Sequence, residues 1–280
     1  MNMDHLGMEK AKRRVVVLLT ACVAPNGMAY TALQDPQIRK NQYLDAIDFY
    51  LRETRFNIVF CENSGVDLWD EISSDQKEKR LEYITFNGNN YNKQYGKGYG
   101  EAIIIRHALQ NSNFIRSANY IIKITGRIKV LNINDIIVSR PQLPTERPVV
   151  KMDFSSDVGR ISSVCFLASK SWLLQVMEKY SDSIRDDGVI NFEGALFKGI
   201  VDCPDLKIMR FNPTLEGVSA GFNIPYRNRG ELIHKNCHYH ILCSIYKVRK
   251  DFWNLFLSFI PFCYYEGLCR MHDLFATRKD

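Results

Sequence analysis

The chain has 280 residues, of which 46% are hydrophobic and 24% are charged, a composition that can bury a full core and excludes an intrinsically disordered protein. Its 37 Lys and Arg against 31 Asp and Glu give a formal net charge of +6. This mild excess is compatible with binding nucleotides, nucleic acid or anionic lipid, and it does not discriminate among these partners. We expect a soluble globular protein with one large domain or two small ones.

The N-terminal region allows two interpretations. Residues 1–13 form a basic tail, and a short apolar run then leads to LTAC at 19–22, as in a bacterial lipoprotein signal. The run is only about seven residues long and continues into VAPNG, which is typical of a strand that ends in a loop. The pattern therefore favours a first β-strand over 14–24.

The first half of the chain alternates strand and helix patterns. Apolar runs predict strands over 14–24, 56–64, 81–86 and 119–133, and intervening patterns predict helices over 35–53, 68–80 and 100–112. This βαβαβαβ order predicts an α/β fold in which helices flank a mostly parallel central sheet. Ligands of such sheets collect at the carboxyl ends of the strands.

The helix over 35–53 has the clearest start signal in the sequence. Asp35 is placed to be the N-cap and Pro36 to occupy the first helical position. We expect one apolar face formed by Ile38, Tyr43, Ile47, Tyr50 and Leu51.

The second half of the chain has shorter elements. After a Pro-rich connection at 139–148, we expect strands over 149–154, 163–169 and 206–211 and helices over 169–180 and 191–201. These elements predict a mixed-sheet extension of the same domain, which would cover 14–230 and be followed by a helical segment over 231–280.

The eight cysteines include no C-x-x-C pair, so we expect reduced thiols of a cytoplasmic protein. The cluster CHYHILC at 237–243 offers two Cys and two His. On a helix these side chains spread over too wide an arc to converge on one metal ion, so we expect a packed helix there.

Polar residues follow three of the predicted strands, at the edge where ligands collect. The first two loops usually face the base and ribose of a nucleotide, whereas cations face its phosphates. The candidate nucleotide-binding residues are Thr20, Ala21 and Asn26 after the first strand, Glu62 and Asn63 after the second, and Lys123, Thr125, Gly126 and Arg127 after the fourth. Strand alternation would place 123, 125 and 127 on one face. The alternative is a pair of surface cations bonded to nearby carboxylates.

A glycine-rich turn precedes the helix over 100–112. Its glycines, Gly96, Gly98 and Gly100, could present backbone N–H groups to an anion together with Lys97. The turn lacks the GK[ST] ending of a P-loop, and the pattern favours an ordinary tight turn over a phosphate contact.

Several segments, taken in order, resemble bacterial glycosyltransferases with a GT-A-like fold that build capsule, O-antigen or lipopolysaccharide glycans. They are VVVLLTACVAPNG, NIVFCENSG, GKGYGEA, IIKITGR, NFEGALFKG and EGVSAGFNIPY, and the resemblance covers roughly residues 14–230. It implies a single GT-A-like domain, a nucleotide-sugar donor and a glycan or lipid-linked acceptor. The usual metal-binding Asp-x-Asp is absent from this chain, and Lys-Ile-Thr-Gly-Arg stands at its position.

The missing motif bears on the expected chemistry. A departing phosphate must be neutralised by a metal or by fixed cations. Lys123 and Arg127 can supply the cations, so we expect no cofactor and no divalent metal. If a metal does take part, Asp153 and Asp157 are the first ligands to test.

Acidic residues near the helix over 191–201 are candidates for the base that accepts the acceptor's proton. Asn191 can cap this helix, and Glu193 in its first turn would be kept ionised by the helix dipole. Asp186 and Asp187 are the alternatives, with Asp153 behind them. A polar loop with Ser219, Tyr226 and Arg227 could close over a diphosphate or be a plain surface loop.

The C-terminal run at 247–270 sets apolar residues beside Lys and Arg, but its apolar part is too short to span a bilayer. It would either lie at an anionic membrane surface on the inner face or pack as a helix. We expect a metal-independent glycosyltransferase. The alternative is a non-catalytic nucleotide- or nucleic-acid-binding α/β module, although the chain shows no RNA-binding or helix-turn-helix signal.

Overall fold

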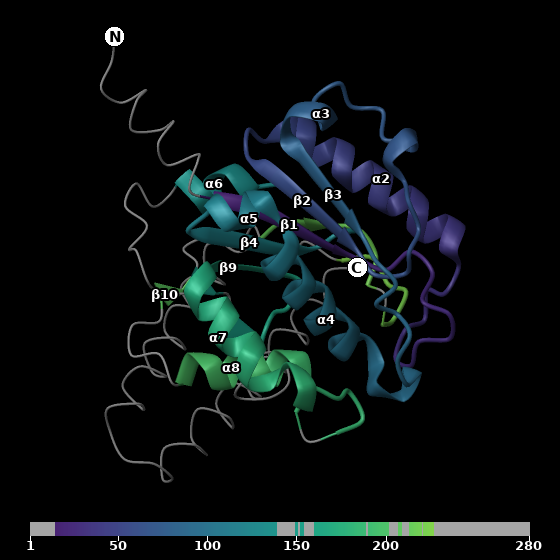
Figure 1. The fold of residues 1–280 in the computed structure, drawn as a ribbon, viewed down its shortest axis with the longest axis vertical. Helices are drawn as coiled ribbons and strands as arrows, with labels where there is room; N and C mark the ends of the chain where they lie inside the picture. The colour runs from purple at the N-terminus through teal and green to yellow at the C-terminus, as the bar shows by residue number, and fades with distance from the viewer. Residues whose placement is uncertain are drawn as a thin grey trace, which may run out of the picture. The chain divides into compact units, whose positions relative to one another are not determined.

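The computed structural model describes residues 15–138, 149–150, 152–153, 160–188, 190–201, 207–208, 213–219 and 221–226 (Figure 1). All of them belong to the compact unit Met1–Glu231. The tail 1–13, the Cys and His cluster at 237–243 and the run at 247–270 lie outside the described residues, so the expectations for them remain predictions.

A seven-stranded sheet forms the centre of this unit. Its strands are β1 (Val15–Ala21), β2 (Asn57–Glu62), β3 (Leu81–Thr85), β4 (Tyr120–Thr125), β6 (Val149–Val150), β9 (Cys165–Ser169) and β10 (Lys207–Ile208). The strand order is β10-β6-β9-β4-β1-β2-β3. Only β9 runs antiparallel to its neighbours, β4 and β6, and the remaining pairs are parallel. The predicted α/β fold with a mostly parallel sheet and a mixed extension is confirmed.

Helices cover both faces of the sheet. They are α2 (Pro36–Glu53), α3 (Lys77–Arg80), α4 (Gly96–Asn111), α5 (Asn113–Ser117), α6 (Ile133–Val138), α7 (Lys170–Tyr180) and α8 (Phe192–Val201). Among the described residues, short 3-10 turns occur at η1 (Trp69–Glu71), η2 (Lys93–Tyr95) and η3 (Ser181–Ser183). Two small ladders pair β5 (Lys129–Val130) with β11 (Leu215–Glu216) and β7 (Met152–Asp153) with β8 (Arg160–Ile161). Figure 1 shows α2 on one side of β1–β3 and α4, α7 and α8 on the other.

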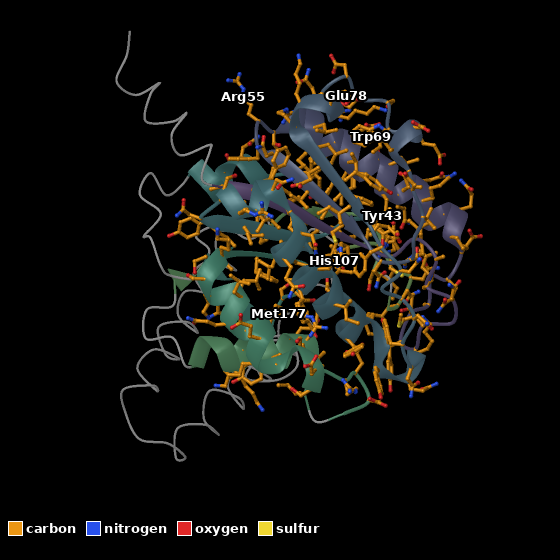
Figure 2. All side chains as sticks on the ribbon, viewed as in Figure 1. Tyr43, Arg55, Trp69, Glu78, His107 and Met177 are labelled. Carbon is orange, nitrogen blue, oxygen red and sulfur yellow. The ribbon has the colours of Figure 1, made fainter. Side chains whose placement is uncertain are left out.

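Alternation along the strands divides the core between these two faces. The side of the sheet that packs on α2 carries Leu19, Phe60 and Ile122, and Tyr43 of α2 meets Phe60 edge to face at 5.6 Å between ring centroids (Figure 2). Thr20 and Lys123 point to the opposite face and contact α4. Polar side chains at the carboxyl ends of β1 and β4 therefore face the N-terminal part of α4.

The start of α2 is as predicted, but its buried face differs by one position. Asp35 accepts hydrogen bonds from the backbone N–H groups of Gln37, at 2.8 Å, and Ile38, at 3.1 Å. Ile38 itself is 48% exposed, whereas Arg39 is buried. The inward stripe follows the helical spacing back from Tyr43 and Ile47, which places residue 39 and not residue 38 against the sheet.

Three predicted elements have different boundaries. The segment 68–80 holds only η1 and α3, separated by irregular chain. The helix predicted over 100–112 already begins at Gly96. The strand predicted over 119–133 ends at Thr125, where a turn closed by a 2.9 Å bond from Ile128 N–H to the Thr125 carbonyl separates β4 from β5. Among the described helices, none is long and apolar enough to cross a membrane.

The described cysteines agree with the expectation of reduced thiols. Cys22, Cys61 and Cys165 are all free, and burial raises the pKa of the Cys22 thiol to about 11. Cys61 and Cys165 are buried in the core of the sheet.

Tyr50 joins α2 to the segment after β4. Its hydroxyl donates to the Ile128 carbonyl at 2.8 Å and accepts from the Val130 N–H at 2.9 Å, in a fully buried position. Tyr50→Phe should lower the free energy of unfolding by about 1–3 kcal/mol, because two buried backbone groups lose their partner. Urea denaturation measures this change. The control Tyr30→Phe, at an exposed side chain, should change it by less than about 0.5 kcal/mol.

Candidate functional site

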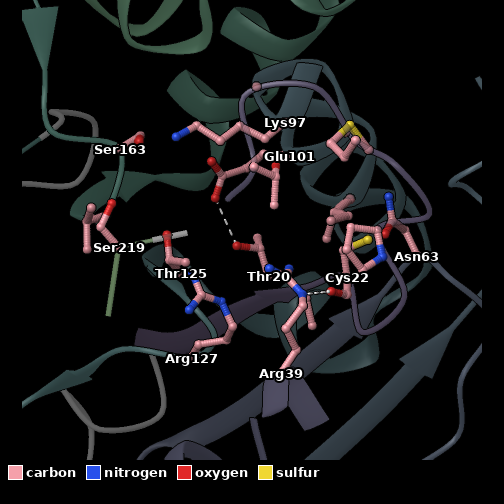
Figure 3. Close-up of a pocket in the computed structure, with 18 of the residues that line it drawn as sticks. Thr20, Cys22, Arg39, Asn63, Lys97, Glu101, Thr125, Arg127, Ser163 and Ser219 are labelled. Atoms are coloured by element: carbon pink, nitrogen blue, oxygen red, sulfur yellow. Dashed lines mark hydrogen bonds between the residues drawn. The ribbon is translucent and has the colours of Figure 1, made fainter. Parts of the chain in front are cut away.

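A cavity of about 130 Å³ lies at the carboxyl ends of β1, β2 and β4 (Figure 3). Segments far apart in the sequence build its walls: the ends of three strands, the N-terminal parts of α2, α4 and α8, and the loops before α2 and after β11. Its lining includes Thr20, Ala21, Cys22, Met28, Thr31, Arg39, Tyr43, Asn63, Tyr91, Lys97, Glu101, Thr125, Arg127, Ser163, Asp186, Glu193, Ser219 and Tyr226.

Two buried guanidinium groups form one wall of the cavity. Arg39, 5% exposed, donates to the Cys22 carbonyl at 2.8 Å, to the Leu33 carbonyl at 3.2 Å and to the Tyr43 hydroxyl at 3.1 Å. All of these acceptors are neutral oxygens. Within the part of the chain that the structure describes, neither Arg39 nor Arg127 forms an ion pair with a carboxylate.

Arg127 is buried too, at 4% exposed, and one of its N–H groups has no hydrogen-bond partner in the structure. It donates to the Gln42 side-chain oxygen and to the Val218 carbonyl, both at 3.0 Å, while its buried Nε has no hydrogen-bond partner. Burial is the main cause that lowers the pKa of Arg127, and the charge of Arg39 adds to it. A guanidinium nevertheless stays protonated in proteins. The wall therefore carries two buried positive charges, and their guanidinium N–H groups that are not bonded to the protein could bind an anion.

Carboxylates line other parts of the cavity, and each has a defined partner. Glu101 accepts from the Thr20 hydroxyl at 3.0 Å and pairs with the fully buried ammonium of Lys123. Glu193 accepts from the Ser163 hydroxyl at 2.7 Å. Figure 3 shows Lys97 and Glu101 across the cavity from Arg39 and Arg127. The two guanidinium groups thus lie on one wall, and Glu101 lies opposite them together with the ammonium of Lys97.

Asp186 holds the start of α4. Its carboxylate accepts the Gly98 N–H at 3.0 Å. Burial raises the pKa of Asp186 and nearby Glu193 raises it further, while the Gly98 N–H and Lys97 act in the opposite direction. A Cβ at Gly96 or Gly98 would overlap this carboxylate, and one at Gly100 would overlap the Tyr91 hydroxyl. The three glycines therefore let α4 approach its neighbours, and the Gly98 N–H is already bonded and not free for a phosphate.

Asn63 at the end of β2 has an amide without partners. Its side chain is fully buried and lines the cavity, and neither its oxygen nor its nitrogen forms a hydrogen bond within the protein. Its backbone, in contrast, is bonded to Ala21 and Gly88. A buried amide without partners costs free energy, so a ligand that offers it a donor and an acceptor would bind favourably.

The structure brings many of the predicted site residues together around this cavity. They are Thr20, Ala21, Asn63, Lys97, Thr125, Arg127, Asp186, Glu193, Ser219 and Tyr226. The predicted cap of α8 is also present, since Asn191 accepts the Gly194 N–H at 2.8 Å. Asn26 and Asp187 are exposed and do not line the cavity. Arg227 and Asp157 lie outside the described residues, and Asp153 pairs through its backbone with Arg160 in the β7–β8 ladder.

Lys123 lies beneath the cavity and not in its lining. Its ammonium contacts Glu101, the Ser163 carbonyl and, at 3.4 Å, the Thr125 hydroxyl. The sequence left open whether the cations after the fourth strand bind an anion or nearby carboxylates. In the structure Lys123 pairs with a carboxylate, whereas Arg127, on the turn after β4, does not.

Glu62 and Gly126 shape the loops around the cavity. The Glu62 carboxylate accepts the N–H groups of Val23, Ser64 and Val66 at 2.9–3.0 Å, so it fixes the loops after β1 and β2. At Gly126, a Cβ would lie 2.8 Å from the Thr20 carbonyl oxygen, which is too close, and its N–H donates to the same oxygen at 2.9 Å. Glu62 and Gly126 therefore position the loops, and neither is proposed to contact a ligand.

Among the lining residues that were not predicted from the sequence are Arg39, Tyr43 and Glu101. A signal existed for the first, because Arg39 precedes Tyr43 by one helical turn and thus interrupts an apolar stripe with a charge. Within the described residues, no group of three or more His, Cys, Asp or Glu side chains is arranged to hold a metal ion.

Compared by sequence, the chain matches no protein-family model and no curated protein. Compared by structure, it is similar to the glycosyltransferase GlyE of Streptococcus pneumoniae TIGR4, with a TM-score of 0.43 and 10% identity over 70% of this chain and 45% of that one. It is also similar to two structures of 4-diphosphocytidyl-2C-methyl-D-erythritol synthase, one from Anaerococcus prevotii DSM 20548, each with a TM-score of 0.40 and 12% identity over 83% of this chain and 99% of the other. The chain thus spans less than half of the GlyE structure, at 45%.

The structural role of Glu62 leads to a prediction. Glu62→Gln should lower the free energy of unfolding by about 1–3 kcal/mol, because the amide nitrogen replaces an oxygen that accepts buried N–H groups. Urea denaturation measures it. Glu53→Gln is the matched control, since the Glu53 carboxylate is 46% exposed and pairs with its exposed neighbour Arg52. Equal stability of the two variants would contradict the role given to Glu62.

Proposed function

We propose that this protein is a glycosyltransferase that moves a sugar from a nucleotide-sugar donor to an acceptor hydroxyl. The observation that carries the proposal is the pair of buried guanidinium groups, Arg39 and Arg127, without a carboxylate partner among the described residues and at the carboxyl edge of a mostly parallel sheet. A diphosphate offers the charge and the acceptor oxygens that these groups lack.

The proposed reaction uses the separation of charges across the cavity. The bond between the anomeric carbon and the phosphate oxygen breaks, and that oxygen leaves with the electron pair. Arg127 and Arg39 stabilise the developing charge from one wall, and Lys97 on the opposite wall is a third cation that lines the cavity. The acceptor hydroxyl forms the new bond to the anomeric carbon, and a carboxylate receives its proton.

Glu193 is the carboxylate proposed to receive this proton. It lines the cavity, and its Oε1 is oriented by the Ser163 hydroxyl. Asp186 shares the cavity but is bonded to the Gly98 N–H, so we assign it the positioning of α4. Asp187 is exposed and outside the lining, and it has no place in this proposal.

The nucleoside is proposed to extend toward Asn63, whose amide has a free donor and a free acceptor. The cavity volume of about 130 Å³ is below the roughly 300–1,000 Å³ of typical small-molecule pockets, so it would hold part of the donor while the rest lies at its mouth.

The acceptor class rests on the sequence resemblance. We propose a bacterial surface glycan, namely capsule, O-antigen or lipopolysaccharide, and with it action in the cytoplasm near the inner membrane. Residues 247–270 would provide the contact with anionic lipid.

Nucleotide titration tests the proposal against a nucleic-acid-binding module. UDP, GDP and CMP are each added to the protein and its melting temperature is followed, because a ligand that binds only the folded state raises it. Stabilisation by one of them supports the donor site. Stabilisation by single-stranded oligonucleotides alone would contradict it.

Arg127→Ala should remove transfer activity while leaving the protein folded. Loss of a charge-assisted contact to the leaving phosphate should cost about 2–4 kcal/mol in the transition state, measured as kcat/KM with the donor that stabilises the protein. Arg127→Lys should recover only part of the loss, since an ammonium group cannot form the bidentate contact of a guanidinium. Arg116→Ala, at an exposed position of α5, is the control. Near wild-type turnover in Arg127→Ala would contradict the role of Arg127 in stabilising the leaving phosphate.

Transfer activity should persist after dialysis against EDTA. The reason is that two buried guanidinium groups already offset the charge of the leaving phosphate. Turnover is compared before chelation, after chelation and after addition of Mn²⁺ or Mg²⁺. Loss of activity on chelation with recovery on metal addition would show that a metal takes part.

A further inference from the structure

Exposed apolar side chains gather near the cavity. Five large hydrophobic residues in the described part of the chain are exposed, and three of them are Tyr30 at 54%, Phe222 at 78% and Ile224 at 56%. We call these three residues the mouth patch. The other two, Ile38 and Leu131, lie on α2 and after β5.

The mouth patch belongs to two loops that touch each other. One loop covers residues 22–35, and the other follows β11 to residue 226. A Cβ at Gly221 would lie 3.6 Å from the Tyr30 carbonyl oxygen and 2.9 Å from the Lys97 ammonium. Both loops also supply lining residues of the cavity: Met28, Thr31, Ser219 and Tyr226. The patch is therefore at the mouth of the proposed donor site.

Internal hydrogen bonds fix the loop that carries Phe222. The Ser219 N–H donates to the Ile224 carbonyl at 2.9 Å, and the Asn223 N–H donates to the Ser219 carbonyl at 2.8 Å. Arg127 holds the base of the loop through the Val218 carbonyl. Phe222 thus stands at the tip of a closed turn that is tied to the cavity wall.

Backbone strain is concentrated in the same two loops. Among the described non-glycine residues, only Asn26, Tyr30 and Asn223 have positive φ, at 51°, 57° and 53°. Such conformations cost free energy, least for Asn, and they cluster at binding sites. The strain at Tyr30 and Asn223 is retained although both side chains project into solvent.

We propose that the mouth patch binds a neutral saccharide of the acceptor by stacking it against Phe222 and Tyr30; this inference rests on the proposed transferase function. One face of a pyranose ring is formed by C–H groups and packs on an aromatic ring, while its hydroxyls require donors and acceptors. The amides of Asn26 and Asn223, on the same loops, can supply them.

The charge of the two loops favours a neutral saccharide over a membrane. Neither 22–35 nor 213–226 contains Lys or Arg, and they carry Asp35 and Glu216, although the Lys97 ammonium lies beside Gly221. Apolar loop tips that enter an anionic bilayer are accompanied by a cluster of basic residues, which one lysine does not provide.

The test uses the full-length protein, saturated with whichever of UDP, GDP and CMP stabilises it, on an array of immobilised neutral oligosaccharides. The wild-type protein should bind at least one of them. Phe222→Ala should weaken that binding by about tenfold, as expected when part of a phenylalanine ring is no longer buried, and Phe222→Trp should retain it. Leu131→Ala is the control, because Leu131 is 46% exposed at the far end of the β5–β11 ladder from Phe222.

Separate measurements distinguish failure of this inference from failure of the proposed function. Stabilisation of the wild-type protein by UDP, GDP and CMP is followed by melting temperature, and its absence with all three counts against the donor site. Absence of oligosaccharide binding, or equal binding by Phe222→Ala and wild type, overturns the proposal that the mouth patch binds a saccharide. Binding to phosphatidylglycerol vesicles that Phe222→Ala weakens, without oligosaccharide binding, would assign the patch to lipid and also overturn the proposal.

Discussion

Arg39 and Arg127 place two positive charges inside the protein, where neutral oxygens are their only hydrogen-bond partners among the described residues. A buried charge without a counter-ion is unfavourable, and a ligand with negative charge relieves that cost. The same guanidinium of Arg127 also holds the loop after β11 through the Val218 carbonyl. Anion binding and the shape of the cavity mouth are therefore linked through one side chain.

The carboxylates of the site are kept apart from this cationic wall by their own partners. Lys123 is fully buried and holds Glu101, and the Gly98 N–H holds Asp186. If these carboxylates paired with Arg39 or Arg127, the cavity would lose its free positive charge. In the proposed transfer, the guanidinium wall would face the leaving phosphate, and the carboxylates, which do not pair with that wall, would be available for the incoming hydroxyl.

Much of the fold followed from patterns that are local in sequence. The alternating order of strands and helices predicted the parallel sheet, and Asp35 and Asn191 were recognisable as helix caps because capping involves neighbours within three residues. The boundaries at Gly96 and Thr125 were missed. Glycine disfavours a helix interior, yet Gly96, Gly98 and Gly100 make room for Asp186 and Tyr91, which no local rule reveals. Likewise, residues 126–128 were predicted to continue the strand, but they form a turn closed by the Ile128 N–H on the Thr125 carbonyl.

By itself the sequence determined which strand ends carry polar residues and therefore which edge of the sheet holds the site, because parallel strands bring their carboxyl ends to one edge. Only the tertiary structure decided which charges are neutralised. Lys123 and Arg127 are four positions apart and were both predicted to bind phosphate, but α4 brings Glu101 to Lys123, while the described residues offer Arg127 neutral oxygens, including those of Gln42 and Val218. Electrostatic pairing depends on distance in space, and spacing along the chain does not determine that distance.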